Sequence, residues 1–115
     1  MNETVARLLN EQINKEFYSA YLYLEFSNYF EEAGLDGFAN WYMIQAQEER
    51  DHAMLFYTYL QNENMPVELG AIAKPDKVFN CHMDVLKAGL EHEKYVTSLI
   101  NDIYSAAYDV RDFRT

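Results

Sequence analysis

The chain has 115 residues, a length that allows one domain and no more. Hydrophobic residues make up 50% of it and charged residues 24%, so it can bury a core, whereas four Gly and two Pro supply too few turns for many short strands. Its 19 acidic residues outnumber 9 basic ones, and the resulting formal charge of −10 repels phosphate backbones and argues against nucleic-acid binding. We therefore predict a single, mostly helical domain over residues 1–115.

Cysteine content and apolar runs bear on the compartment of the protein. Cys81 is the only cysteine, which excludes an internal disulfide and a multi-cysteine zinc site. No window approaches the roughly 18 continuous apolar residues of a membrane span, and the charged N-terminus contains no apolar signal core. We therefore predict a cytoplasmic protein that does not insert into a membrane.

Three long segments carry a helical pattern. The first is free of Gly and Pro until Gly34, which is a typical helix stop. The second begins at Asp36, a favourable N-cap residue, and is broken by Pro66 and the asparagines before it. The third begins near Asn80, another residue that can cap a helix. The predicted helices span residues 4–33, 36–62 and 80–107, followed by a turn over 108–115.

The lengths of the two connections predict the topology. The short turn over residues 34–37 makes the first two helices antiparallel neighbours. The second connection, residues 64–79, has about 16 residues and reaches roughly 50 Å when extended. A helix of about 27 residues is only about 40 Å long, so this loop can cross the bundle and leave the third helix parallel to the second. An antiparallel pair followed by a crossover is typical of a four-helix bundle, and this sequence contains no fourth helix.

One glutamate lies in the middle of the most apolar stripe of each predicted helix. On a helical wheel, Glu16, Glu49 and Glu93 are flanked mainly by hydrophobic residues and lie at matching depth near the waist of the bundle. Buried unpaired carboxylates cost several kcal/mol or take a proton, and three that converge repel one another. A divalent metal ion removes this penalty, and His52, three residues after Glu49, adds an imidazole on the same side. The pattern therefore predicts a metal site.

Simpler interpretations exist for single residues of this pattern. A lone histidine on a partly apolar face is more often a hydrogen-bonded structural residue, and a single glutamate there often reaches solvent. His82 and His92 keep the structural interpretation, because neither comes with a carboxylate at the matching depth. Three glutamates at one depth, together with His52, favour the metal site.

Three stretches of the sequence resemble the bacterial non-haem ferritins of the ferritin-like di-iron family. They are NEQINKEFYS at residues 10–19, AQEERDH at 46–52 and EHE at 91–93. The first two are long and specific, the third depends on its spacing, and the resemblance covers essentially all 115 residues. It implies an all-α, ferritin-like bundle, incomplete at its C-terminus, in which the fourth helix is missing from this chain.

The resemblance implies roles for five metal-binding residues. Glu16, Glu49 and His52 correspond to the ligands of the first iron of a ferroxidase centre. Glu49 is expected to bridge to a second iron that Glu93 also binds. Glu48 corresponds to the outer ligand of a third, transit site for iron.

The resemblance further implies the chemistry of the centre. Tyr23 corresponds to the tyrosine beside the two irons, which supplies an electron during oxygen reduction. Arg50 stands where haem-binding bacterioferritins carry a methionine, so we expect iron and no haem. The implied function is iron storage and detoxification, in which Fe(II) is oxidised by O₂ and Fe(III) mineral is kept in a homo-oligomeric, 24-subunit cage.

Two other functions remain open. One is a truncated, catalytically impaired helical module that oligomerises, or receives a partner helix, through an open apolar groove between the first and third helices. The other is the oxidase or peroxidase chemistry of rubrerythrin relatives, which usually add a cysteine-rich iron domain that one cysteine cannot provide. Fe(II)-dependent consumption of O₂ separates a ferroxidase from an interaction module. The residues expected to line the groove are Leu9, Phe30, Leu86, Ile100 and Tyr104.

Overall fold

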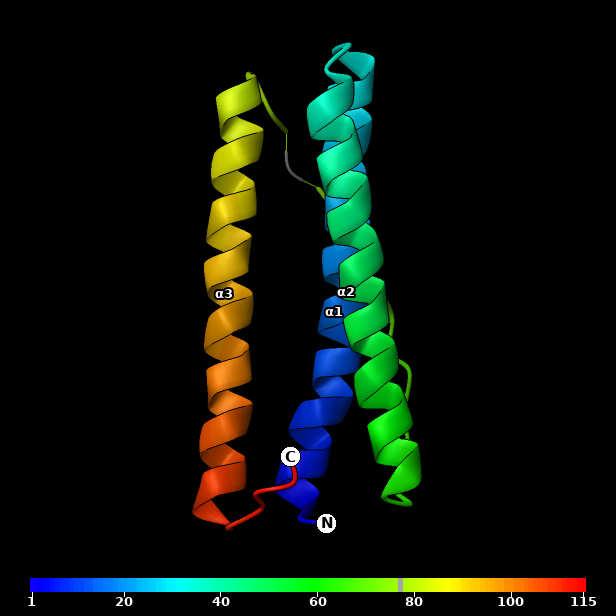
Figure 1. Cartoon of the computed structure of the whole chain (residues 1–115), viewed down its shortest axis with the longest axis vertical. Helices are drawn as coiled ribbons and strands as arrows, with labels where there is room; N and C mark the ends of the chain where they lie inside the picture. The colour runs from blue at the N-terminus through cyan, green and yellow to red at the C-terminus, as the bar shows by residue number, and fades with distance from the viewer. Residues whose placement is uncertain (77) are drawn as a thin grey trace.

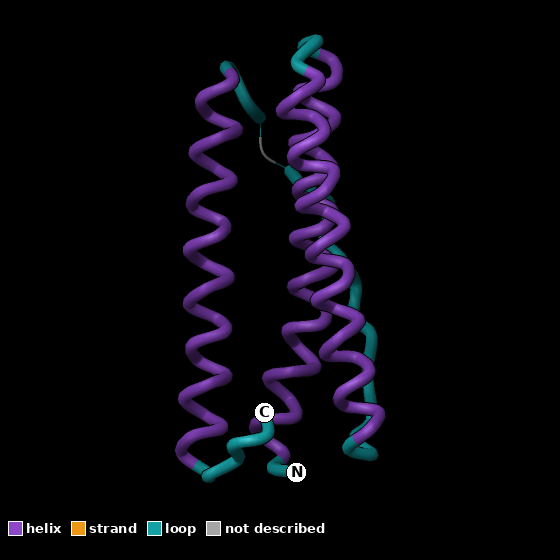
Figure 2. The backbone as a smooth tube through the Cα atoms, viewed as in Figure 1, coloured by secondary structure: helices purple, strands orange, loops and turns teal. Residues whose placement is uncertain are grey.

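The computed structural model describes residues 1–76 and 78–115, and within them it contains three helices and no strand. These are α1 (Glu3–Glu32), α2 (Asp36–Asn62) and α3 (His82–Asp109). They form an elongated bundle that measures 48 × 22 × 22 Å (Figures 1 and 2). The all-α prediction is confirmed, and each predicted helix boundary lies within two residues of the observed one.

The predicted topology is also confirmed. α1 and α2 run antiparallel, the connection after α2 returns along the whole bundle, and α3 then runs parallel to α2 (Figure 1). Residue 77 of this crossover lies outside the described residues. Asn10 of α1 holds the crossover at Glu68 through two hydrogen bonds. Its side-chain amide donates to the Glu68 carbonyl at 2.9 Å and accepts from the Glu68 backbone N–H at 2.9 Å. Asn14 donates to the carbonyl of Ala71, also at 2.9 Å.

The turn between α1 and α2 corrects one capping prediction. Gly34 adopts a positive φ of 75°, which suits glycine, and the N–H of Leu35 donates to the carbonyl of Phe30 at 2.9 Å. This geometry ends α1 and places Leu35, without a side-chain cap, at the N-cap of α2. Asp36 is therefore not the N-cap but the first helical residue, where its charge favours the positive end of the helix dipole.

The start of α3 corrects a second capping prediction. Cys81, and not Asn80, occupies the N-cap position, and its side chain makes no capping hydrogen bond. Asp84 in the first turn takes over part of this role, because its carboxylate accepts a hydrogen bond from the backbone N–H of Asn80 at 3.2 Å. An acidic residue in the first turn also stabilises this end of the helix electrostatically.

Two apolar clusters form the core, and a polar layer separates them. The cluster near the α1–α2 turn is built around the buried side chains of Phe26, Phe30 and Tyr42. The cluster at the other end contains Leu9 and Leu60 among its buried members. Along both α1 and α2, the residues between these clusters include a buried glutamate, which is the arrangement that matched depth predicted.

The open groove lies between α2 and α3, and not between α1 and α3 as predicted. α3 packs on α1, and α2 and α3 make no close backbone approach along the described helices. Of the predicted groove residues, Leu9 and Phe30 are only 2% and 0% exposed. A cavity of about 690 Å³ instead lies beside the α1–α2 turn and is lined by Phe38 and Trp41 of α2 and Leu86 of α3. The groove prediction failed because it assigned the uncovered face to α1, which both other helices cover.

Candidate metal centre

Glu16 is the most deeply buried carboxylate of the polar layer. Its side chain projects from the middle of α1 and the residue is 1% exposed. Gln12, one turn earlier on the same face, donates its Nε2 to Glu16 Oε1 at 3.0 Å and so fixes the orientation of the carboxylate. Glu16 Oε2 is buried and has no hydrogen-bond partner.

Glu49 of α2 is the second buried carboxylate, at 7% exposure. Its Oε2 is likewise buried without a hydrogen-bond partner. Burial raises the pKa of Glu49 to about 9, and the neighbouring carboxylates of Glu16, Glu93 and Glu48 push it in the same direction. Around neutral pH the metal-free site therefore holds a proton on Glu49, which relieves the repulsion between the two carboxylates.

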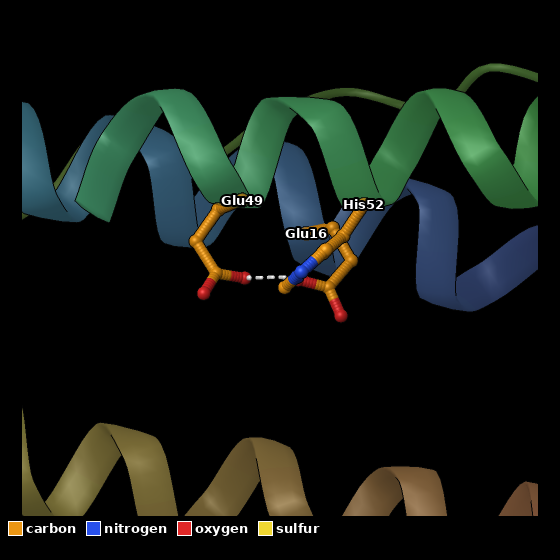
Figure 3. A group of neighbouring side chains, drawn as sticks. All are labelled: Glu16, Glu49 and His52. Atoms are coloured by element: carbon orange, nitrogen blue, oxygen red, sulfur yellow. Dashed lines mark ion pairs between the residues drawn. The ribbon is translucent and has the colours of Figure 1, made fainter. Parts of the chain in front are cut away.

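His52 completes a group of three ligand atoms. It follows Glu49 by one helical turn, and its Nδ1 lies 3.6 Å from Glu49 Oε2 and 4.0 Å from Glu16 Oε2 (Figure 3). One ligand atom from each of the three side chains lies within 4.8 Å of the others. The His52 side chain is 51% exposed, so the group is buried on its carboxylate side and open to solvent on its imidazole side.

The donor set fits a divalent first-row metal ion. Two carboxylate oxygens without partners face one imidazole nitrogen, and buried polar atoms normally have partners. A cation placed between them supplies the missing partner and offsets the negative charge of both carboxylates. Two oxygens and one nitrogen suit iron, zinc or manganese better than a soft metal that prefers thiolates. The structure thus brings together three of the residues that the sequence predicts.

Glu93 is not buried as the helical wheel predicted. It is exposed on α3, and it lines a cavity of about 420 Å³ on the groove side, together with Tyr23 of α1 and Tyr42 of α2. The hydroxyl of Tyr23 donates to Glu93 Oε1 at 2.8 Å. The helical wheel placed Glu93 in a buried stripe because it did not distinguish the face that packs on α1 from the uncovered face.

Tyr23 links Glu93 to the core. It is 1% exposed, and burial together with the adjacent Glu93 raises the pKa of its phenol, so the hydroxyl keeps its proton. Its ring packs against Tyr42, at 5.7 Å between centroids. Glu48 lies outside the group of three ligands and is exposed on α2, and its charge contributes to the raised pKa of Glu49.

The other histidines have partners outside the metal group. His82 Nδ1 lies 3.1 Å from the Tyr29 hydroxyl, and His92 Nε2 lies 2.7 Å from Ser19 Oγ. Both placements agree with the structural interpretation of these residues. Sequence reasoning missed the Ser19–His92 pair, since nothing in the spacing of residues on two separate helices indicates that they meet.

Gly89 is a second feature that sequence reasoning missed. A Cβ on this residue would lie only 2.6 Å from the Tyr42 hydroxyl, so the absence of a side chain lets Tyr42 reach α3 across the groove. A glycine inside a helix costs about 1 kcal/mol relative to alanine, and this cost was the available signal for a close contact.

None of the described helices is long and apolar enough to span a membrane.

Comparisons with known proteins agree with this architecture. Residues 6–115 match the ferritin family, described as a ferritin-like domain. A bacterial non-heme ferritin of Campylobacter jejuni is 38% identical over 115 residues, which cover 100% of this chain and 69% of that protein. The open-pore ferritin of Archaeoglobus fulgidus superposes with a TM-score of 0.95 at 37% identity, over 99% of this chain and 70% of that chain. A ferritin of Chlorobium tepidum gives 0.95 at 31% identity over the same shares.

The matches include the whole of the candidate site. All three residues of the metal group lie inside the matched range of residues 6–115, as do Tyr23 and Glu93. The helix order, the crossover and the buried carboxylate layer therefore occur in a chain whose sequence and fold both match ferritins. The chain belongs to the ferritin family of helical iron-storage proteins.

Proposed function

We propose that this chain is an iron-storage subunit that binds Fe(II) at Glu16, Glu49 and His52 and oxidises it to Fe(III) with O₂. The observation that carries the proposal is the pair of buried carboxylate oxygens without hydrogen-bond partners, Glu16 Oε2 and Glu49 Oε2, which lie 4.0 and 3.6 Å from His52 Nδ1. The similar proteins are named non-heme ferritins, which supports iron as the metal. Iron enters this reaction as the substrate that is oxidised and then stored.

Each residue of the group has a distinct task in binding Fe(II). Glu16 supplies a charged oxygen whose direction Gln12 fixes through its hydrogen bond. Glu49 supplies the second oxygen after it gives up its proton, so that the incoming dication is exchanged for a proton. His52 supplies a nitrogen on the exposed side, where the ion can enter from solvent. Bound iron supplies the electrons for O₂ reduction, and oxygen ligands favour the Fe(III) product.

A second iron would lie toward α3 in this proposal. Glu49 would bridge the two ions through its single carboxylate, and Glu93 is close enough for its charge to contribute to the raised pKa of Glu49. The hydrogen bond from Tyr23 holds Glu93 Oε1 and leaves its other oxygen free to bind metal. Tyr23 is then the residue that supplies a further electron, and exposed Glu48 the ligand of a transit site. We propose assembly into the homo-oligomeric cage of the family, without haem.

A second candidate function is supported by the groove between α2 and α3. Phe38 and Trp41 of α2 and Leu90 of α3 are 45%, 58% and 58% exposed, and contiguous apolar surface of this kind favours association. In that function the chain is an interaction module and the carboxylate pair has no catalytic task. The two functions differ in whether the protein consumes O₂ in the presence of Fe(II).

The test measures Fe(II) binding without O₂ and then O₂ consumption when it is admitted. Wild-type protein is expected to bind Fe(II) and consume O₂ in proportion, whereas Glu49→Gln loses both because its amide supplies neither charge nor a strong ligand. Glu91→Gln removes an exposed acid from α3 and serves as the matched control with wild-type behaviour. Equal O₂ consumption by all three proteins would contradict the proposed centre, and none by wild type would favour the interaction module.

A further inference from the structure

A line of three aromatic rings connects the candidate centre to the protein surface. Tyr23, buried at 1% exposure, packs edge-on against His92 of α3, at 5.7 Å between ring centroids and 87° between planes. His92 in turn packs against Tyr95, at 6.1 Å and 53°. Tyr95 is 51% exposed, so only one ring separates the phenol beside the centre from a phenol in solvent.

The middle ring of this line is fixed in place. His92 Nε2 lies 2.7 Å from Ser19 Oγ, and Ser19 is itself 1% exposed and donates to the carbonyl of Lys15 at 3.0 Å. Tyr18 packs on His92 as well, at 6.1 Å between centroids. A side chain that is only half buried thus has contacts from α1 that hold it between the two tyrosines. Packing and hydrogen bonds that position a ring in this way are the usual support of a functional site.

We propose that Tyr23, His92 and Tyr95 form a route for single electrons between the iron centre and the surface. The inference rests on the proposed ferroxidase function, because reduction of O₂ by Fe(II) at the centre supplies the oxidant. The route deepens that function by naming how an oxidising equivalent leaves the buried site, where it would otherwise damage the core. Tyr23 is the inner redox group, His92 the positioning residue and Tyr95 the outer redox group.

The transfer balances in electrons and protons. The oxidant at the centre takes one electron from Tyr23, whose phenolic proton moves along its 2.8 Å hydrogen bond to Glu93 Oε1. One electron from Tyr95 then passes across His92 to the Tyr23 radical, which recovers its proton from Glu93. Tyr95 loses its own phenolic proton to water and is left as a neutral radical at the surface. A soluble reductant restores Tyr95 by donating one electron and one proton.

The test follows the tyrosyl radical after Fe(II)-loaded protein is mixed with O₂ and frozen at successive times. In wild type, the electron paramagnetic resonance signal of Tyr23 is expected to decay quickly, and peptide mass spectrometry should find oxidation products at Tyr95. Tyr95→Phe keeps the ring but removes the hydroxyl that makes it easy to oxidise, so the Tyr23 radical signal should last several-fold longer. Tyr21→Phe is the matched control, because Tyr21 is 53% exposed on α1 and no described ring contacts it.

A second measurement separates this inference from the proposed function. Iron-free protein is oxidised by a photogenerated ruthenium tris-bipyridine ion, which is too large to reach buried Tyr23 directly. Without iron, the Glu93 carboxylate accepts the Tyr23 proton more readily than when it binds a metal ion, so in this iron-free protein the radical should move inward from Tyr95 to Tyr23. Wild type and Tyr21→Phe should therefore show a radical at Tyr23, and Tyr95→Phe and His92→Leu should not. Normal Fe(II) oxidation with no effect of Tyr95→Phe in either measurement would overturn the route alone. Absence of Fe(II) oxidation by wild type would overturn the ferroxidase proposal and the direction of transfer inferred from it.

Discussion

Replacing Glu49 by Gln should stabilise the metal-free protein while it destroys metal binding. Glu49 has its pKa raised from 4.5 to about 9 by burial and by the neighbouring Glu16, so the folded state binds its proton more tightly than the unfolded state. An acid whose pKa is raised on folding contributes stability that is complete below its pKa in the unfolded state. This stability is lost as the pH rises toward its pKa in the folded state. Wild type should therefore lose stability from about pH 4.5 to about pH 9.

The size of this effect follows from proton linkage. One proton taken up on folding changes the free energy of unfolding by about 1.4 kcal/mol per pH unit. Between the unfolded pKa of 4.5 and pH 7, this amounts to about 3 kcal/mol. The amide introduced by Glu49→Gln cannot ionise. The free energy of unfolding of this variant should therefore exceed that of wild type by about this amount at pH 7 and by less at pH 5.

Urea unfolding in the presence of a chelator measures this difference. The free energy of unfolding is compared for wild type, Glu49→Gln and the exposed control Glu91→Gln at pH 5, 6, 7 and 8. The gap between wild type and Glu49→Gln should widen as pH rises, whereas the control should follow wild type. A variant less stable than wild type at every pH, or a constant gap, would show that Glu49 is not a buried, protonated acid.

Three further outcomes are expected. Fe(II) affinity should rise by about tenfold per pH unit near neutrality, because binding displaces the Glu49 proton. Calorimetry in buffers of different ionisation heat measures the released protons, and a release of none would contradict this prediction. Gly89→Ala should lower the melting temperature, because its Cβ would lie 2.6 Å from the Tyr42 hydroxyl and displacing this buried ring costs more than the roughly 1 kcal/mol that alanine gains over glycine in a helix. Gly70→Ala, with its nearest contact at 3.6 Å, should change little, and a melting temperature that rises in Gly89→Ala would refute the close approach. Trp41→Glu should reduce self-association of the 115-residue chain in sedimentation experiments, since the indole is 58% exposed in the groove. An unchanged distribution of oligomeric species would indicate that the interface lies elsewhere.

The helices and the central pair of carboxylates could be predicted because both depend on periodicity within one helix. Glu16 and Glu49 each lie on the buried face of their own helix, and His52 follows Glu49 by a single turn. The short turn between α1 and α2 then brings the two glutamates together, because they lie at the same depth in an antiparallel pair. The caps at Leu35 and Cys81 were missed, because the Gly34 turn sets the start of α2 and Asp84, in the first turn of α3, accepts the hydrogen bond from Asn80. Capping preference concerns the residue at one position, whereas the start of a helix also depends on the turn that precedes it.

Relations between helices were less predictable than relations within them. The wheel of α3 has one hydrophobic side, but which part of it packs on α1 depends on the position of all three helices. Glu93 was therefore assigned to a buried stripe, whereas the structure leaves it exposed. Tyr104 was expected on the open groove and is indeed 69% exposed, but Leu9 and Phe30, expected beside it, are buried. The Tyr23–Glu93 hydrogen bond and the Ser19–His92 pair join residues more than 60 positions apart, and a single sequence carries no signal for such meetings.

The central claim is that Glu16, Glu49 and His52 bind iron in one site. Anomalous diffraction at the iron absorption edge, from crystals soaked in Fe(II) without O₂, tests this claim most directly. The account predicts a peak roughly 2.0–2.2 Å from Glu16 Oε2, Glu49 Oε2 and His52 Nδ1, which is the usual range for such ligands on first-row ions. Iron only at exposed acidic residues, with the buried oxygens still unpartnered, would contradict it.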